Sequence, residues 1–199
     1  MKILIAPYQA TFDAIQKRLE EMGKGEQMKD VLKKAINDLA KETKEQLHEE
    51  TKGMYTIKAS QFRKSDIRKN SRNGSSMLTV KGTTIPIRKG YRNRKNSKRK
   101  AASALIRKAS GALKAMELKS GGRGYKAFVA TMKSGHEGIF QRVPGKRMKS
   151  NPKKEAIQEM VSLSRSKAAE MAYREKISDG IQGEMSFHLL KQMNAVIGG

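Results

Sequence analysis

Three histidines are the side chains best suited to acid–base or metal chemistry in this chain, and their placement argues against both. His48, His136 and His188 are scattered, without the short spacings that bring metal ligands together. His136 precedes Glu137, a base beside a carboxylate, but both belong to a predicted glycine turn with no second acid nearby. We therefore interpret His136 as a turn residue that contacts its neighbours. Because the chain has no cysteine, disulfides and thiolate metal sites are excluded, and we expect no cofactor.

Other catalytic patterns are also missing from the sequence. No nucleophile elbow, phosphate loop or dinucleotide fingerprint occurs. The glycine-rich stretch 121–124 lacks the Lys-Ser/Thr pair that follows in nucleotide-binding loops, and instead predicts a hairpin turn. Residues 52–154 contain only three acids, Asp66, Glu117 and Glu137, too few for a two-metal nuclease centre. We expect a protein that is not an enzyme.

Positive charge dominates the middle of the chain. The formal net charge is +24 over 199 residues. Residues 52–154 hold 29 Lys and Arg against those three acids, a formal +26, whereas the two flanks together carry −2. A charge this large and this localised indicates a polyanionic partner, since self-repulsion otherwise opposes compaction.

Two segments, 88–100 and 144–154, hold the densest basic residues. Neither shows apolar periodicity, so both are predicted to be mobile loops, and 88–100 is predicted to be disordered in the free subunit. The sequence leaves open whether these loops face DNA or acidic surfaces of neighbouring subunits. In either case the candidate contact residues are Arg88, Lys89, Arg92, Arg94, Lys95, Lys98, Arg99, Lys100, Lys146, Arg147 and Lys149.

The stretch 127–142 reads as two strands joined by a tight turn. Phe128 and Ala130 alternate with Val129 and Thr131, and the return strand begins near Phe140. Gly135 and Gly138 flank the predicted reversal, because glycine tolerates backbone angles that a Cβ forbids. We expect both phenylalanines to be core anchors and Gly135, His136 and Gly138 to form the turn.

Further period-two runs predict more antiparallel strands. A hairpin is predicted from 78–81 and 85–88, with Pro86 at an edge because it cannot donate to a ladder. Strands are also expected over 113–119, 125–132, 138–143 and 156–163.

Apolar residues at helical spacing predict helices over 11–22, 26–50, 166–178 and 184–197, with shorter ones at 60–69 and 101–110. The predicted class is α+β: an antiparallel sheet from about 77 to 143, packed by a long N-terminal helix and C-terminal helices. The segments are a helical arm 1–52, a basic β-rich domain 53–163 and a helical segment 164–199, together one structural unit. The apolar run in the first ten residues is too short for a signal peptide, and no run has membrane length.

Three pieces of the chain together resemble the phage minor tail protein Z family, whose members complete the tail. The first is the helix through Ala35 and Leu39 leading into 55–58 (YTIK), and the second is 78–82 (LTVKG) with Ile85 and Pro86. The third and most specific is 127–140, AFVATMKSGHEGIF. The likeness thins after Arg142, where residues 161–164 (VSLS) stand in place of the family's Gly-Pro-Ser element.

The resemblance implies a structural part of a long-tailed phage particle, at the head-proximal end or neck, where a finished tail becomes competent to join a DNA-filled head. It implies a ring of identical subunits, for which a hexamer is one arrangement. The implied neighbours are the tail terminator, the tail tube or tape measure, and head-completion proteins. Phage DNA would be contacted through phosphates without sequence preference. The implied location is the virion, after assembly in the host cytoplasm, with no membrane partner and no catalytic residues.

A rival interpretation is a cellular nucleic-acid-binding protein of ribosomal or nucleoid type, which the charge alone would suit. Base reading is poorly supported, since neither a zinc finger nor a helix-turn-helix stands out and aromatic residues are few. A nuclease is least favoured because acidic residues are scarce where the charge would attract the substrate.

Overall fold

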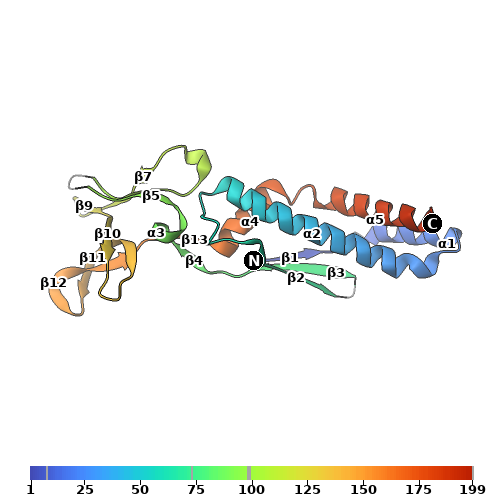
Figure 1. Ribbon diagram of the computed structural model, residues 1–199, viewed down its shortest axis with the longest axis horizontal. Coiled ribbons are helices and arrows are strands. Elements are labelled where there is room, and N and C mark those ends of the chain that lie inside the picture. Colours follow the sequence, from blue (N-terminus) through green and yellow to red (C-terminus); the bar gives the residue numbers. More distant parts are fainter. Residues whose placement is uncertain (8, 73, 98–99, 199) are drawn as a thin grey trace. The chain divides into compact units, whose positions relative to one another are not determined.

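The computed structural model describes residues 1–7, 9–72, 74–97 and 100–198 (Figure 1). It contains helices and antiparallel sheets, so the predicted α+β class is confirmed, including the long N-terminal helix and the C-terminal helices. The chain forms two compact units: unit 1 is 1–51, 63–82 and 166–199, and unit 2 is 52–62 and 83–165. Residues 63–82 thus belong to the same unit as the N- and C-terminal helices, and the segment on either side of them belongs to unit 2.

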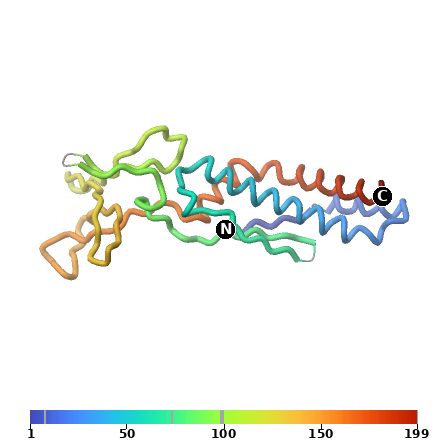
Figure 2. The backbone as a smooth tube through the Cα atoms, viewed as in Figure 1, coloured from blue at the N-terminus to red at the C-terminus, as the bar shows by residue number. Residues whose placement is uncertain are grey.

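Unit 1 combines helices with a three-stranded sheet of order β1-β3-β2. Its segments come from both ends of the chain and from 63–82, as the colours in Figure 2 show. Its elements are β1 (Lys2–Ile5), α1 (Gln9–Glu21), α2 (Met28–Met54, which runs on past residue 51), β2 (Ile67–Arg72), β3 (Ser75–Val80), α4 (Arg165–Lys176) and α5 (Ile181–Ile197).

Helix α2 forms because apolar residues recur every three or four positions along it. Val31, Ala35, Leu39 and Leu47 are fully or almost fully buried on this stripe. Thr43 is buried on the same face, and its hydroxyl donates to the Leu39 carbonyl at 2.8 Å, so burial leaves no polar group unsatisfied there.

Polar contacts join α2 to α5 beside this apolar stripe. The His188 ring lies 2.9 Å from the Glu42 carboxylate, and Gln192 donates to Asp38 at 2.8 Å. The Lys24 ammonium donates at 2.6 Å to the Val196 carbonyl at the end of α5. A cation at this end offsets the partial negative charge of the unpaired carbonyls.

Unit 2 consists of short strands in four small sheets, β13-β4, β5-β6-β7, β8-β9 and β10-β11-β12. A compact core of small and branched side chains includes Ile87, Ala102, Ala127 and Ile139. The elements are β4 (Thr84–Pro86), α3 (Ile87–Gly90), β5 (Arg92–Arg94), β6 (Ser103–Leu105), β7 (Lys114–Ala115), β8 (Glu117–Ser120), β9 (Arg123–Lys126), β10 (Phe128–Thr131), β11 (Glu137–Met148), β12 (Asn151–Glu159) and β13 (Val161–Ser164).

The predicted hairpin between 78–81 and 85–88 is wrong. Strand β3 pairs with β1 and β2, and β4 pairs with β13, so the two runs belong to different sheets and different units. The short helix predicted over 60–69 is also wrong, since Ile67 begins β2. The partners of a strand depend on segments distant in sequence, which local alternation does not specify.

The predictions for the basic segments also need correction. Residues 88–94 are ordered as α3 and β5, because Tyr91 is fully buried and anchors them. Residues 144–154 lie mostly in the β11–β12 hairpin, with a register shift between Arg142 and Arg147 that accommodates Pro144. The helix predicted over 101–110 is replaced by β6 and a 3₁₀ turn, since Ala102 and Ala104 pack into the core of unit 2.

Gly90 lies where no side chain fits. A Cβ built on Gly90 would lie 2.0 Å from the Cγ2 atom of Ile85, itself buried. Gly90→Ala is therefore expected to lower the free energy of unfolding by about 1–3 kcal/mol through overpacking. Chemical denaturation followed by circular dichroism measures this change.

The matched control is Gly183→Ala in α5, where the added methyl meets no atom within 4 Å. This control should gain up to about 1 kcal/mol, because alanine favours a helix over glycine. Equal effects of the two substitutions would contradict the close packing of α3 against β4.

Candidate functional site

Unit 2 contains a cationic pocket of about 680 Å³ beside α3, called here the basic pocket. Its lining combines four cationic side chains with polar groups that can donate hydrogen bonds and a single carboxylate. The lining residues are Lys58, Ser60, Gln61, Arg88, Lys89, Tyr91, Arg92, Asn93 and Glu137.

Asn93 holds the single turn of α3 in place. Its amide nitrogen lies 3.1, 3.0 and 2.7 Å from the carbonyl oxygens of Ile87, Arg88 and Tyr91, and the first of these also accepts from the backbone N–H of Tyr91. Its amide oxygen accepts from the Arg88 guanidinium at 2.8 Å. One side chain therefore fixes both the backbone turn and the direction of a cation that lines the pocket.

Tyr91 anchors the floor of the basic pocket. The side chain is fully buried, and this burial raises the pKa of its hydroxyl. The phenol therefore stays neutral at physiological pH. Its neutral ring forms the buried floor of the pocket, and the cationic side chains of Arg88, Lys89 and Arg92 lie close to it in the chain.

The charge of the pocket is only partly compensated within the unit. Glu137 accepts from Arg88 at 3.1 Å and lies 3.7 Å from the Lys95 ammonium. In the ranges that the structure describes, no carboxylate pairs with Lys58, Lys89 or Arg92. The pocket can therefore accept an anion, and its cations could contact phosphate or carboxylate oxygens.

A second basic cluster lies on the β11–β12 hairpin. Lys146, Arg147 and Lys149 are exposed there, as are Lys153 and Lys154 on the other strand. The Arg147 guanidinium donates to the Lys153 carbonyl at 3.5 Å, which ties one strand to the other. The strand pairing thus presents several cations on a hairpin, where the sequence predicted a flexible, turn-rich loop.

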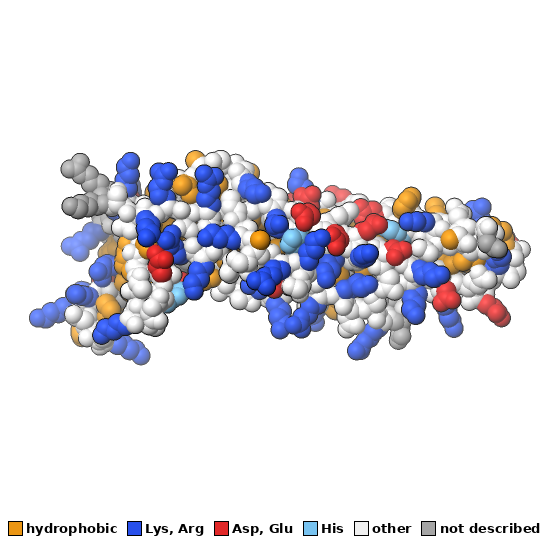
Figure 3. Space-filling view, in the orientation of Figure 1, with side chains coloured by type: hydrophobic (Ala, Val, Ile, Leu, Met, Phe, Trp, Pro, Cys, Tyr) orange, Lys and Arg blue, Asp and Glu red, His pale blue; other side chains and the backbone are white. Residues whose placement is uncertain are grey.

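Unit 2 as a whole carries most of the charge of the chain. It holds 24 Lys and Arg against four Glu, a formal +20 of the total +24. On the face drawn in Figure 3, Lys and Arg side chains project from many parts of unit 2 and acidic ones are few there. Such a surface attracts polyanions without reading a sequence.

The structure brings some of the predicted contact residues together and leaves others apart. Arg88, Lys89 and Arg92 line one pocket, joined by Lys95 through Glu137, whereas Arg94 and Lys100 are exposed outside it. Lys98 and Arg99 lie outside the described residues.

Sequence reasoning missed six of the nine residues that line the basic pocket, including its charged residues Lys58 and Glu137. Lys58 follows α2 and is about thirty positions from Arg88 in the sequence. The backbone N–H of Lys58 donates to the Gly90 carbonyl at 2.8 Å, which brings the two segments together. The only signal in the sequence that could have indicated Lys58 is the excess of positive charge over residues 52–154. Glu137 was considered as a possible catalytic acid, not as a partner of cations.

The predicted hairpin of 127–142 is present as β10 and β11. Phe128 and Phe140 are direct cross-strand partners, and Gly135 in the turn has a φ of +80°. A Cβ on Gly138 would come within 2.9 Å of the Phe140 ring, so glycine is required there as well. Phe140 is buried as predicted, but Phe128 is only half-buried, which corrects its expected role as a full core anchor.

His136 has a structural environment consistent with the sequence interpretation. Its Nε2 atom lies 2.9 Å from the Glu159 carboxylate, and its ring stands edge-on to Phe140 at 6.3 Å between centroids. The first contact ties the β10–β11 turn to the neighbouring strand β12, and the second packs it against β11.

Within the described ranges, no three His, Asp or Glu side chains are grouped so that they could hold a metal ion. None of the described helices combines the length and the apolar character needed to cross a bilayer.

Comparison with known proteins gives no relative: no family model, curated protein or solved structure matches the chain.

Proposed function

We propose that this chain is a structural tail-completion subunit of a long-tailed phage, acting at the head-proximal end of the tail. The observation that carries the proposal is the segment 127–140, whose sequence resembles the phage minor tail protein Z family. It is supported by the fold of that segment: β10 and β11 form a tight hairpin in which Gly135, Gly138 and the Phe128–Phe140 pair each have a geometric role.

The charge distribution suits a subunit placed near packaged DNA. A formal +20 on unit 2 lets the basic pocket and the β11–β12 hairpin contact phosphates without sequence preference, while unit 1 is close to neutral. In this proposal unit 1 makes protein contacts within a homo-oligomeric ring and with tail or head-completion proteins. Unit 2 faces the DNA.

A second candidate is a cellular protein that binds nucleic acid without sequence preference. The concentration of positive charge on unit 2 supports this candidate as well as the first, because every duplex or single-stranded nucleic acid carries the same phosphates. The two candidates differ in what the protein does without nucleic acid. A tail-completion subunit associates with itself and with tails, and the cellular binder does not.

The test is to purify the chain with nuclease and high salt, then measure its mass by light scattering and image it by negative-stain microscopy, alone and with tails of the encoding phage. We expect one defined oligomer and added density at one end of the tail. A monomer or dimer that does not bind tails but binds duplex DNA at physiological salt would favour the second candidate. A protein that does neither would overturn both.

A further inference from the structure

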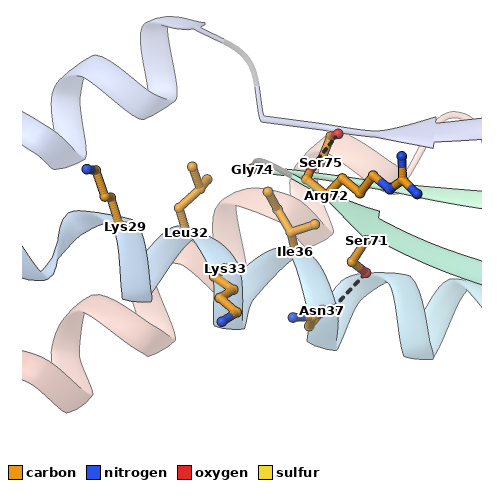
Figure 4. Close-up of a pocket in the computed structure, with 9 residues that line it drawn as sticks. All are labelled: Lys29, Leu32, Lys33, Ile36, Asn37, Ser71, Arg72, Gly74 and Ser75. Atoms are coloured by element: carbon orange, nitrogen blue, oxygen red, sulfur yellow. Dashed lines mark hydrogen bonds between the residues drawn. The ribbon is translucent and has the colours of Figure 1, made fainter.

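A groove in unit 1 lies between helix α2 and the β2–β3 hairpin. It encloses about 700 Å³, a volume typical of ligand sites. We call it the α2 groove. It is lined by Lys29, Leu32, Lys33, Ile36 and Asn37 of α2 and by Ser71, Arg72, Gly74 and Ser75 of the hairpin segment (Figure 4).

The two walls of the α2 groove are held at a fixed separation. At one point Asn37 accepts hydrogen bonds from Ser71 at 2.9 Å and from Lys69 at 3.2 Å. At another, Gly74 lies against Leu32, since a Cβ on this glycine would be 3.2 Å from the leucine Cδ2. The groove is thus bounded by contacts between its own walls.

The floor of the groove is aliphatic and its rim is cationic. Figure 4 shows Leu32 and Ile36 extending from α2 toward the hairpin. Lys29, Lys33 and Arg72 surround them, all exposed, and in the described part of the chain none of the three pairs with an acid. No carboxylate is among the described residues that line the groove.

This combination fits a peptide better than a nucleic acid. Nucleic-acid grooves stack bases on aromatic side chains, and none of the described residues that line this site is aromatic. An aliphatic floor instead accepts an apolar side chain, and a cationic rim pairs with carboxylates beside it.

We propose that the α2 groove binds an acidic segment of a partner protein, with an aliphatic side chain seated against Leu32 and carboxylates paired with Lys29, Lys33 and Arg72. The site belongs to unit 1 and is separate from the basic pocket of unit 2. The proposal therefore does not depend on whether unit 2 contacts DNA.

The test uses a fluorescein-labelled synthetic peptide of glutamates with a central pair of leucines, titrated with the full chain by fluorescence anisotropy. The double variant Lys29→Glu with Lys33→Glu is expected to weaken binding at least about 10-fold, because attraction at the rim becomes repulsion. Leu32→Ala should weaken it about 3- to 10-fold through lost apolar contact. Circular dichroism checks that each variant is folded.

The matched control is Lys34→Glu with Lys41→Glu, which makes the same charge change on α2 outside the groove lining. Unchanged binding by the control supports the proposal, and an equal loss would overturn it as an effect of net charge. Equal affinity for a peptide in which serines replace the leucines would also overturn it. The proposal would also be overturned if the peptide did not bind and the groove variant lost affinity for duplex DNA. That result would mean that the groove binds phosphate.

Discussion

Phe140→Ala is expected to lower the free energy of unfolding by about 3–5 kcal/mol, the largest stability effect predicted for this chain. The Phe140 ring is 6% exposed, lies over Gly138 and meets the His136 ring edge-on. Truncation leaves a cavity where the ring lay, beside Gly138 and the His136 ring. Urea denaturation followed by circular dichroism measures the loss.

Phe128→Ala is the matched control, because Phe128 is the cross-strand partner of Phe140 in the same sheet. Its side chain is only half-buried, so the expected cost is about 1–2 kcal/mol from the smaller apolar area removed from water. If Phe128→Ala proved the more costly substitution, the relative burial of the two phenylalanines described here would be wrong.

The second large effect is expected in polyanion binding. Replacing Lys58, Lys89 and Arg92 of the basic pocket with Gln removes three cations that have no acidic partner among the described residues. Each phosphate contact releases condensed counterions, so the slope of log K against log salt for duplex DNA should flatten by up to about 2.7 units. Fluorescence anisotropy across a salt series gives this slope.

Two further triple variants separate the pocket from net charge and from the second cluster. One variant replaces Lys34, Lys41 and Lys44 of α2 with Gln and so removes the same charge. The slope of log K against log salt for this variant should equal that of the unmodified protein within error. Lys146, Arg147 and Lys149 replaced with Gln report on the β11–β12 hairpin. An equal flattening by the α2 variant would refute a specific role for the pocket. An unchanged slope with lost tail joining would mean that the pocket binds a protein neighbour.

The sequence alone determined the features that depend on local periodicity and composition. Leu39 and Leu47 recur at the helical period, which was enough to predict α2, and the C-terminal helices follow from the same pattern. The glycine turn between Phe128 and Phe140 specified the β10–β11 hairpin, because alternation sets the faces and glycine permits the reversal. The concentration of charge on unit 2 was visible from counting residues.

Tertiary structure decided the partners of the strands and the convergence of the cations. The sequence did not show that β3 lies between β1 and β2, although the dipeptide Asn73–Gly74 is a hairpin signal that could have indicated the β2–β3 pair. Only the fold brings Lys58 to Arg88 and Arg92, because a backbone hydrogen bond joins segments distant along the chain. Local sequence patterns determine whether a segment is a helix or a strand. Burial against segments distant in the chain, such as that of Tyr91, determines what each element packs against and which side chains come into contact.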